Sequence, residues 1–366
     1  MPDAHKPAGL RKLLYDEIAQ VIDSGQSLSE DDFNSLALRV FSYQLSANPV
    51  YRGFFDAARS QAPRHWKEIP ALPSAAFKRA QVAAFPVQNA TTWFETSGTT
   101  EGETGRHFFE TLELYERAIL PPFKRLLLPD CERMRMEILT APPAKMPHSS
   151  LVHMMETVRQ RFGTGESGYH GRIDSVDIDS LARSLSESAE KQQPVFLLGT
   201  AFGFVNALEE MARRNLKFNL PFGSRIMETG GFKGRSREIA RSDFYGILSD
   251  AFGIPQFNIV NEYGMTELSS QFYDVSLRNQ AATEWKIGPE WARVLIVDPE
   301  TGREMPPGVM GLVRIIDLAN VGSVLALQTE DVGVAAENGS FQVLGRVGKS
   351  SPRGCSLPME FAGRTA

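Results

Sequence analysis

The sequence predicts an α/β protein with a helix-covered, mainly parallel sheet, a helical N-terminal region and a small C-terminal antiparallel β subdomain. Through the middle of the chain, apolar residues at helical spacing alternate with short runs typical of buried strands. Such alternation favours βαβ units and a parallel sheet. Beyond about residue 285 the helical spacing stops, and short strand patterns are separated by turns rich in glycine and proline.

The N-terminal region, residues 8–60, is predicted to be helical. Leucine, isoleucine, valine and phenylalanine recur there at steps of three and four residues. Ser29 followed by Asp32 resembles a capping box in which a shorter acid takes the third position. Residues 68–86 carry three prolines in an otherwise apolar stretch, so we expect an irregular connection.

The middle of the chain supplies the predicted sheet and the helices that cover it. Helices are expected at 111–128, 175–192, 201–215 and 236–252, and strands in "MRMEILTAPP", "PVFLLGT", "SRIMETGG" and "QFNIVNEYG". Ligands of parallel sheets bind outside the C-terminal ends of the strands. Three glycine turns, at Gly98, at Gly230 with Gly231, and at Gly264, fall where such a pocket would lie.

We expect three parts along the chain. Residues 1–285 form the α/β core, 286–345 form a β subdomain with strands such as "ARVLIVD" and "GLVRIIDL", and 346–366 form a glycine-rich, basic tail.

The composition is that of a globular protein. The 39 basic and 44 acidic residues are well mixed, and without a Lys/Arg run a nucleic acid is not an expected partner. No segment approaches the roughly 20 apolar residues of a membrane span, and the N-terminus lacks the apolar stretch of a signal peptide. We therefore expect a cytoplasmic protein. Two cysteines, Cys131 and Cys355, are too few for a zinc site or a disulfide framework.

The segment "TSGTTEGETGRH" (96–107) packs three glycines and five hydroxyl residues into twelve positions. Backbone N–H groups freed by glycine, together with these hydroxyls, suit the oxygens of a phosphate group. A surface loop is the alternative for such a segment taken alone. It is not a Walker P-loop, because the Gly-Lys-[Ser/Thr] ending is missing.

Three later segments add groups that suit a nucleotide. "NEYGMTEL" (261–268) offers a ring that can stack on a base, a hydroxyl for a phosphate and a carboxylate for Mg²⁺. "TED" (329–331) offers an acid for ribose hydroxyls, and "GRVGKSSPRG" offers Arg346. Taken alone, "NEYGMTEL" is also compatible with a turn after a buried strand, the acid of "TED" is more typical of a turn, and the basic residues are more typical of a solvated face.

In this fixed order, the four segments resemble the adenylate-forming superfamily of acyl-CoA synthetases, luciferases and peptide synthetase adenylation domains. From about residue 30 to the tail, the chain is most similar to the acyl-protein synthetase family, the fatty-acid-activating component of the bacterial bioluminescence reductase complex. The segments "LLGTAF", "ETGGFKGRSREI", "NEYGMTEL" and "RGCSL" carry this closer resemblance.

The resemblance implies an enzyme that uses ATP and Mg²⁺ to turn a long-chain fatty acid or related acid into an acyl-adenylate. It implies a nucleotide site in which Thr266 contacts the α-phosphate, Glu267 holds Mg²⁺ and Tyr263 stacks on the base beside Gly264. The remaining implied nucleotide-binding residues are Thr96, Ser97, Gly98, Thr99 and Thr100 at the triphosphate, Gly230 and Gly231 at the adenine, and Asp331 and Arg346 at the ribose hydroxyls.

The chain departs from the superfamily pattern at two points. The glycine loop normally continues with Gly-x-Pro-Lys, whereas here Arg106 is the only candidate to replace that lysine as a catalytic residue. Superfamily members also continue past the Gly-Arg hinge into a mobile domain of about a hundred residues. Here twenty residues follow Arg346, so we expect that domain to be truncated.

The truncation makes a thiol on the tail the expected acyl acceptor. Cys355 is flanked by Lys349 and Arg353, which would lower the pKa of its thiol and favour attack on the acyl-adenylate. The resemblance implies the same, because that family becomes acylated on a cysteine near its C-terminus. A small residue packed at the tail is the alternative for Cys355, and such a buried role is favoured for Cys131.

Three functions remain open from the sequence. The first passes the acyl group to Cys355 and then to an acyl reductase or a carrier protein. The second is an acyl- or aryl-CoA, or acyl-carrier-protein, ligase of the phenylacetate-CoA ligase type. The third only binds a nucleotide or an acyl ligand within a larger complex. The acid, the oligomeric state and the roles of five weaker candidates stay open: His107, His170, Phe202, Phe204 and Phe232.

Overall fold

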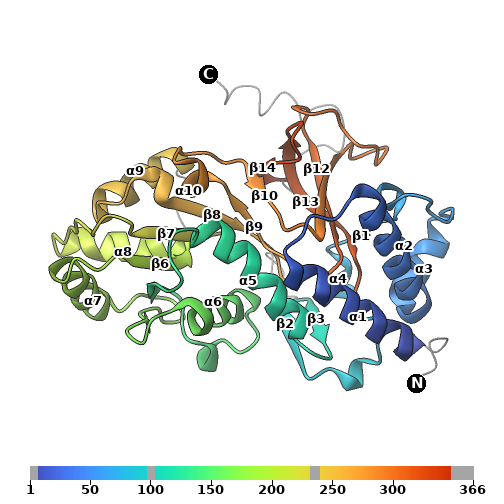
Figure 1. Cartoon of the computed structure of the whole chain (residues 1–366), viewed down its shortest axis with the longest axis horizontal. Helices are drawn as coiled ribbons and strands as arrows, with labels where there is room; N and C mark the ends of the chain where they lie inside the picture. Colours follow the sequence, from blue (N-terminus) through green and yellow to red (C-terminus); the bar gives the residue numbers. More distant parts are fainter. Residues whose placement is uncertain (1–6, 97–103, 231–239, 348–366) are drawn as a thin grey trace. The chain divides into compact units, whose positions relative to one another are not determined.

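The computed structural model describes residues 7–96, 104–230 and 240–347 of the chain (Figure 1). Contacts divide the chain into two compact units, each made of separate stretches. The first, called here the terminal unit, comprises Met1–Arg117, Glu267–Ser270 and Trp285–Ala366. The second, called here the central unit, comprises Ala118–Thr266 and Gln271–Glu284.

The central unit contains strands in the order β9-β8-β7-β6-β4-β5. β4 to β8 pair in parallel, and β9 pairs antiparallel with β8. The bounds are β4 Arg135–Ile138, β5 Gly168–Tyr169, β6 Val195–Thr200, β7 Arg225–Thr229, β8 Ile259–Tyr263 and β9 Phe272–Asp274.

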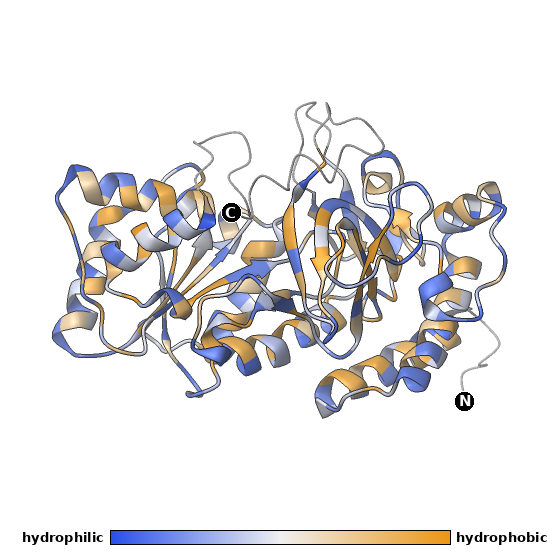
Figure 2. Ribbon diagram, turned by 90° about the horizontal axis from the view of Figure 1, so that it is seen from above, coloured by the Kyte–Doolittle hydropathy of each residue, from blue (hydrophilic) through white to orange (hydrophobic). Residues whose placement is uncertain are grey.

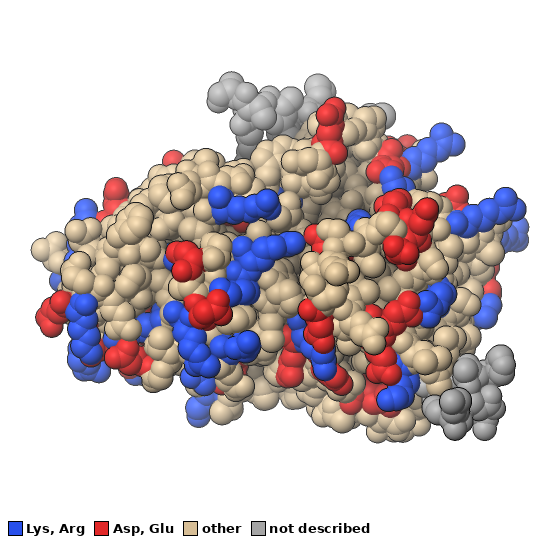
Figure 3. Space-filling model, in the orientation of Figure 1, with Lys and Arg blue, Asp and Glu red and all other residues tan. Residues whose placement is uncertain are grey.

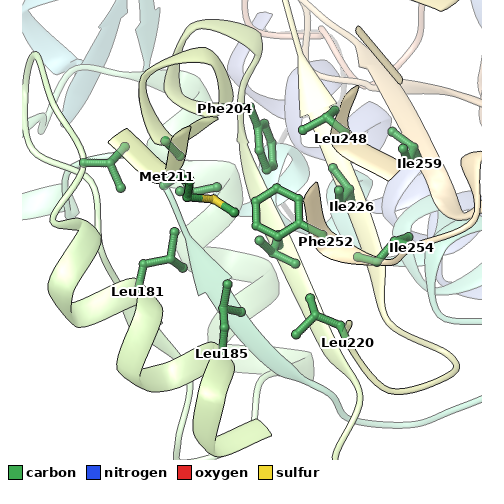
Figure 4. Close-up of a cluster of buried hydrophobic side chains, with 14 of the residues drawn as sticks. Leu181, Leu185, Phe204, Met211, Leu220, Ile226, Leu248, Phe252, Ile254 and Ile259 are labelled. Carbon is green, nitrogen blue, oxygen red and sulfur yellow. The ribbon is translucent and has the colours of Figure 1, made fainter. Parts of the chain in front are cut away.

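Helices cover both faces of this sheet. On one face α7, α8 and α9 bury a cluster that includes Phe204 and Phe252 against Ile226 of β7 (Figure 4). On the other face Phe123 of α5 stacks on Phe196 of β6, with 5.7 Å between ring centroids. The bounds are α5 Glu113–Leu127, η3 Pro143–Lys145, α6 Ser150–Phe162, α7 Ile178–Glu190, α8 Ala201–Arg213, α9 Arg241–Phe252, η4 Gln256–Asn258 and α10 Ser276–Asn279.

The amphipathic pattern of these helices explains the packing. Figure 2 shows hydrophobic and hydrophilic residues mixed along each helix, and a helix of this type buries one side and solvates the other. Each large apolar side chain buried in this way contributes about 1.5–3 kcal/mol to the stability of the fold.

The terminal unit holds an antiparallel sheet in the order β11-β12-β13-β14-β10, and β1 pairs in parallel with β13. A separate hairpin is formed by β2 and β3. The strand bounds are β1 Leu72–Pro73, β2 Thr92–Glu95, β3 Arg106–Phe109, β10 Lys286–Ile287, β11 Ala292–Val297, β12 Gly311–Asp317, β13 Ala326–Ala335 and β14 Phe341–Arg346.

Helices of the terminal unit come mainly from its N-terminal stretch. They are α1 Pro7–Ser24, α2 Glu30–Ala47, α3 Pro49–Ala57, η1 Trp66–Glu68, α4 Ala76–Arg79 and η2 Val87–Asn89. Ser29 is the N-cap of α2, as predicted, and its side chain accepts a hydrogen bond from the Asp32 backbone N–H at 3.1 Å. The Asp32 carboxylate accepts from the Ser29 hydroxyl at 2.6 Å, so the N-cap half of the predicted capping box is the part observed. Gln44 of α2 is fully buried, and its amide donates to the Asn320 carbonyl at 2.8 Å.

The predicted α/β class is confirmed, including the antiparallel β segment after residue 285. The stretch 68–86 is more ordered than an irregular connection, because it contains β1 and α4. The compact units place residues 1–117 with the C-terminal strands, whereas the sequence predicts residues 1–285 as one core. The three-part division of the chain stays a prediction.

Candidate functional site

Adjacent parallel strands of the central unit end at the same level. Thr200 of β6 is in register with Thr229 of β7, which in turn is in register with Glu262 of β8. Gly230 and Tyr263 directly follow these paired positions, so the predicted glycine turn and the predicted base-stacking ring lie at one sheet edge. Ligands of parallel sheets bind at this edge.

The turn after β7 needs its glycine. Gly230 has φ +87°, a conformation that side-chain-bearing residues rarely adopt. Among the described residues, no neighbouring atom lies within 4 Å of where a Cβ at Gly230 would stand. The positive φ, rather than crowding by the described residues, is therefore what favours glycine here.

The end of β8 is held by side chains on both sides. The Thr229 hydroxyl donates a hydrogen bond to the Glu262 carboxylate, which is buried. A Cβ at Gly264 would come within 2.3 Å of Glu262 Oε1, so the absence of a side chain at Gly264 lets this carboxylate lie against the turn. Two residues on, the Thr266 hydroxyl lies 3.2 Å from the Ser150 hydroxyl at the start of α6.

A buried polar layer lies one register position below Thr229 and Glu262, at Glu228 of β7 and Asn261 of β8. Asn261 donates from its amide to Glu228 Oε1 at 2.7 Å, and the Tyr245 hydroxyl donates to the same oxygen at 2.9 Å. Burial raises the pKa of Tyr245 well above its ordinary value, so the phenol stays a hydrogen-bond donor. Asp274 accepts from the Asn261 backbone N–H at 2.8 Å. Sequence reasoning missed this layer, which fixes β7, β8 and β9 relative to one another.

In the terminal unit, the β2–β3 hairpin carries the predicted phosphate loop. Two hydrogen bonds join Thr96 to Gly105. The Thr96 N–H donates to the Gly105 carbonyl at 2.9 Å, and the Thr96 hydroxyl accepts from the Gly105 N–H at 2.8 Å. The Thr96 side chain is buried. The Thr96 hydroxyl and N–H therefore hold the end of β2 to Gly105, the residue before β3.

Arg106 stands at the other end of this loop. It is exposed, it is the register partner of Glu95, and its guanidinium carbon lies 5.3 Å from the centre of the Trp93 ring. The ring contact supports the arginine without covering it. Its predicted catalytic role stays a prediction.

The two predicted ribose-binding residues lie side by side. Asp331 of β13 and Arg346 of β14 are register partners, with 3.8 Å between Asp331 Oδ1 and Arg346 Nε. Glu330 also approaches Arg346 Nε, at 3.3 Å. An acid and a guanidinium in this arrangement present both hydrogen-bond acceptors and donors to vicinal hydroxyls.

Glu267, the predicted metal ligand, is 7% exposed. Its backbone carbonyl accepts a hydrogen bond from the Asn320 amide at 2.9 Å. Within the part of the chain that the structure describes, no group of three or more His, Cys, Asp or Glu residues is arranged to hold a metal ion. A single carboxylate is compatible with Mg²⁺, which usually takes one or two carboxylates together with substrate phosphates.

The structure thus gathers the predicted residues in groups. Gly230, Tyr263, Gly264 and Thr266 belong to the central unit, whereas Thr96, Arg106, Glu267, Asp331 and Arg346 belong to the terminal unit. Their convergence on one nucleotide stays a prediction. Several predicted residues lie outside the described residues: Ser97, Gly98, Thr99, Thr100, Gly231, Phe232 and Cys355.

Four of the weaker candidates, His107, His170, Phe202 and Phe204, are among the described residues. His170 lies 2.6 Å from Glu137 and 3.0 Å from the Ser180 hydroxyl in a buried network that also includes Arg135. His107 is buried against Phe109, with 4.2 Å between ring centroids. Phe204 belongs to the core cluster of Figure 4, and Phe202 is half-buried on α8. Cys131 is partly buried, and burial raises the pKa of its thiol.

The fold is that of adenylate-forming enzymes. The chain is similar to 2-hydroxyisobutyryl-CoA ligase in complex with 2-HIB-AMP and CoA, at 13% identity with a TM-score of 0.66, covering 89% of this chain and 72% of that one. It is also similar to ATP-bound MatB of Rhodopseudomonas palustris, at 15% identity with a TM-score of 0.52. That match covers 71% of this chain, which spans about half (49%) of the MatB chain.

The family model for "Acyl-protein synthetase, LuxE" matches residues 24–362, and the chain belongs to this family. Two relatives are named long-chain-fatty-acid–luciferin-component ligase. The Aliivibrio fischeri protein is 20% identical over 89% of this chain and 87% of its own length, and the Vibrio harveyi protein is 21% identical over 88% and 85%. The predicted family and the predicted enzyme class, an acyl-adenylate-forming ligase, are confirmed.

The charge distribution and the hydropathy of the helices complete the description. Figure 3 shows basic and acidic side chains interspersed over the face in view, consistent with the net charge of -5. Among the described residues, no helix is long and apolar enough to cross a membrane.

Proposed function

We propose that this chain activates a long-chain fatty acid with ATP and transfers the acyl group to the thiol of Cys355. The match of the acyl-protein synthetase family to residues 24–362 carries the proposal. The names of the two curated relatives support a long-chain fatty acid as the substrate class. ATP-bound structures of the same fold support ATP as the second substrate.

In the first half-reaction, a carboxylate oxygen of the fatty acid attacks the α-phosphorus of ATP. A new O–P bond forms, the bond to the β-phosphate oxygen breaks, and pyrophosphate leaves with the electron pair. Placement and charge neutralisation supply most of the rate in such a reaction. Bound Mg²⁺ supplies neutralisation of the phosphate charge, and Glu267 is its proposed protein ligand.

The described residues suit the nucleotide in this step. The turn at Gly230 and the ring of Tyr263 flank the proposed adenine position, and the Thr266 hydroxyl is the proposed donor to the α-phosphate. Asp331 and Arg346 take the ribose hydroxyls. Arg106 is proposed to contact a phosphate from the end of its loop.

In the second half-reaction, the Cys355 thiolate attacks the carbonyl carbon of the acyl-adenylate. A C–S bond forms, the C–O bond to the phosphate breaks, and AMP leaves. The acyl group then passes from the thioester to an acyl reductase or a carrier protein. We propose the cytoplasm as the location, because its reducing conditions keep a nucleophilic thiol free.

Labelling of the protein tests the acceptor. Incubation with ATP, Mg²⁺ and a radiolabelled long-chain fatty acid should give a protein-bound label that hydroxylamine releases. Cys355→Ser should abolish the label, whereas Cys131→Ser, the matched control, should retain it. A label that survives in Cys355→Ser would exclude this route.

Two further measurements separate the alternatives. Acyl-CoA or acyl-carrier formation that does not need Cys355 would support a ligase of the phenylacetate-CoA type. Exchange of pyrophosphate into ATP that depends on the fatty acid reports adenylation itself, and its absence would leave only a binding function.

A further inference from the structure

The carboxylate of Asp317, at the end of β12, is buried without a cation. Its side chain is 0% exposed, and no Lys, Arg or His pairs with it among the described residues. Burial raises the pKa of Asp317 to about 6, although hydrogen bonds oppose the shift. A buried carboxylate is costly unless its oxygens are hydrogen-bonded. The partners of those oxygens therefore indicate what the residue holds in place.

Two of these partners belong to the segment 267–270. Asp317 Oδ2 accepts from the Ser269 backbone N–H at 2.9 Å, and Oδ1 accepts from the Ser270 hydroxyl at 2.8 Å. The Trp291 indole N–H donates to the same Ser270 hydroxyl at 2.9 Å. The Ala319 N–H also donates to Oδ1, at 3.1 Å. One carboxylate therefore joins this segment to the turn after β12.

Asn320, in the same turn, holds the other end of the segment. Its amide donates to the Glu267 carbonyl at 2.9 Å, and its side-chain oxygen accepts from the Ser269 hydroxyl at 3.0 Å. Asn320 is 2% exposed, and Gln44 fixes its backbone carbonyl. The backbone that bears Glu267 is thus anchored from a buried turn that is far away in the sequence.

We infer that Asp317 and Asn320 are positioning residues that fix the Glu267 carboxylate for Mg²⁺ bound with ATP. The inference rests on the proposed function, in which Glu267 is the metal ligand. Asp317 and Asn320 act through the backbone of 267–270, since Asn320 bonds the Glu267 carbonyl and Asp317 bonds the Ser269 N–H. Displacement of a site group by about 1 Å can cost about a hundredfold.

Direct binding of ATP tests the inference without turnover. Isothermal titration calorimetry on the full chain would compare ATP affinity in Mg²⁺ with ATP affinity in EDTA. Asp317→Asn removes one acceptor from the Ser269–Ser270 pair, and Asn320→Ala releases the Glu267 carbonyl. In both variants, the ratio of ATP affinity in Mg²⁺ to ATP affinity in EDTA, called here the Mg²⁺-dependent gain, should fall about tenfold. Their ATP affinity in EDTA should stay within about twofold of that of the unmodified chain.

Ser323→Ala is the matched control. Ser323 is also fully buried in this turn, but its hydroxyl donates to the Val82 carbonyl at 3.0 Å and not to the segment 267–270. This variant should lose stability and keep the Mg²⁺-dependent gain. Asn320→Ala keeps the inference testable where Asp317→Asn fails to fold, because it leaves the buried carboxylate with its partners.

The outcomes separate this inference from the proposed function. If Asp317→Asn and Asn320→Ala bind Mg²⁺ with ATP as Ser323→Ala does, while Glu267→Gln loses the gain, the positioning role is wrong and the metal site stands. If the unmodified chain shows no Mg²⁺-dependent gain, the proposed metal role of Glu267 fails first and the inference falls with it.

Discussion

Asp331 and Arg346 face each other across the β13–β14 ladder, with 3.8 Å between the Asp331 carboxylate and Arg346 Nε. The aspartate is mostly buried, with 18% of its side chain exposed, whereas 38% of the arginine side chain is exposed. The strand register and the ion pair hold the carboxylate in a fixed orientation. A ribose bound here would meet an acceptor and a donor whose relative position is set by strand register.

This pair makes a prediction about nucleotide selectivity. Asp331→Asn should weaken ATP binding about ten- to hundredfold, because a hydrogen bond to a charged group contributes about 1.5–3 kcal/mol. The same substitution should weaken binding of 2′-deoxy-ATP or 3′-deoxy-ATP much less, because these analogues already lack a ribose hydroxyl that the Asp331 carboxylate would bind. Equilibrium binding of the three nucleotides would measure the difference.

Glu330→Gln is the control for the Asp331 variant. It removes the carboxylate that lies 3.3 Å from Arg346 Nε and leaves Asp331 in place. Discrimination between ATP and its deoxy analogues should be unchanged. Full discrimination in Asp331→Asn would contradict the ribose role.

Gly230 and Gly53 form a matched pair for a prediction about stability. At both positions an added Cβ has no neighbouring atom within 4 Å in the part of the chain that the structure describes. Gly230→Ala should cost about 1–2 kcal/mol because φ is positive. Gly53→Ala, in α3, should gain about 0.5–1 kcal/mol. Urea denaturation would measure the free energy of unfolding of both variants. Only Gly230→Ala should also weaken ATP binding. Equal changes in the free energy of unfolding for the two substitutions would contradict the argument.

Local features of the fold were predictable from the sequence. The Ser29–Asp32 cap depends on residues three apart, and the turn at Gly230 follows a strand whose burial pattern is continuous. Such features are determined by short-range spacing and by backbone chemistry. The glycine turn after β7 is therefore predictable from the sequence.

Features that join distant segments were not predictable from spacing. β1 pairs with β13 through Leu72 and Leu327, and two residues give too short a pattern to indicate a strand. Likewise Asp317 and Asn320 are ordinary turn residues until the fold brings them to the segment 267–270. Their one sequence signal is a polar residue at the end of an apolar strand, with a second polar residue three positions later.

The Glu156 cluster predicts a pH dependence of stability. Glu156 accepts from Arg159 at 2.7 Å and from the Tyr169 hydroxyl at 2.5 Å, and the Arg159 bond in particular lowers the pKa of this carboxyl from 4.5 to about 2. The ionised form is the one that the fold favours. Its contribution to stability is therefore complete above pH 4.5 and is lost as the pH falls through 2.

Glu156→Gln should flatten the fall in the free energy of unfolding between pH 4.5 and pH 2. Glu190→Gln, an exposed carboxyl at the end of α7, should leave that fall unchanged. Chemical denaturation at several pH values would measure both variants. An identical slope in Glu156→Gln and the unmodified chain would contradict the assignment.

Arg106 is the candidate replacement for the lysine that usually follows the glycine loop, so its substitution tests whether this loop supports adenylation. If its guanidinium contacts a phosphate in the transition state, Arg106→Met should lower kcat for pyrophosphate exchange about a hundredfold, as loss of one such donor does elsewhere. Arg106 is exposed, and a ring contact of such a residue contributes only about 0.5–1 kcal/mol, so the melting temperature should change little. Arg106→Lys keeps the charge and should recover part of kcat. Trp93→Leu removes the ring and should alter stability more than kcat. If Arg106→Met keeps full kcat, the role of Arg106 is structural, in the β2–β3 hairpin, and not catalytic.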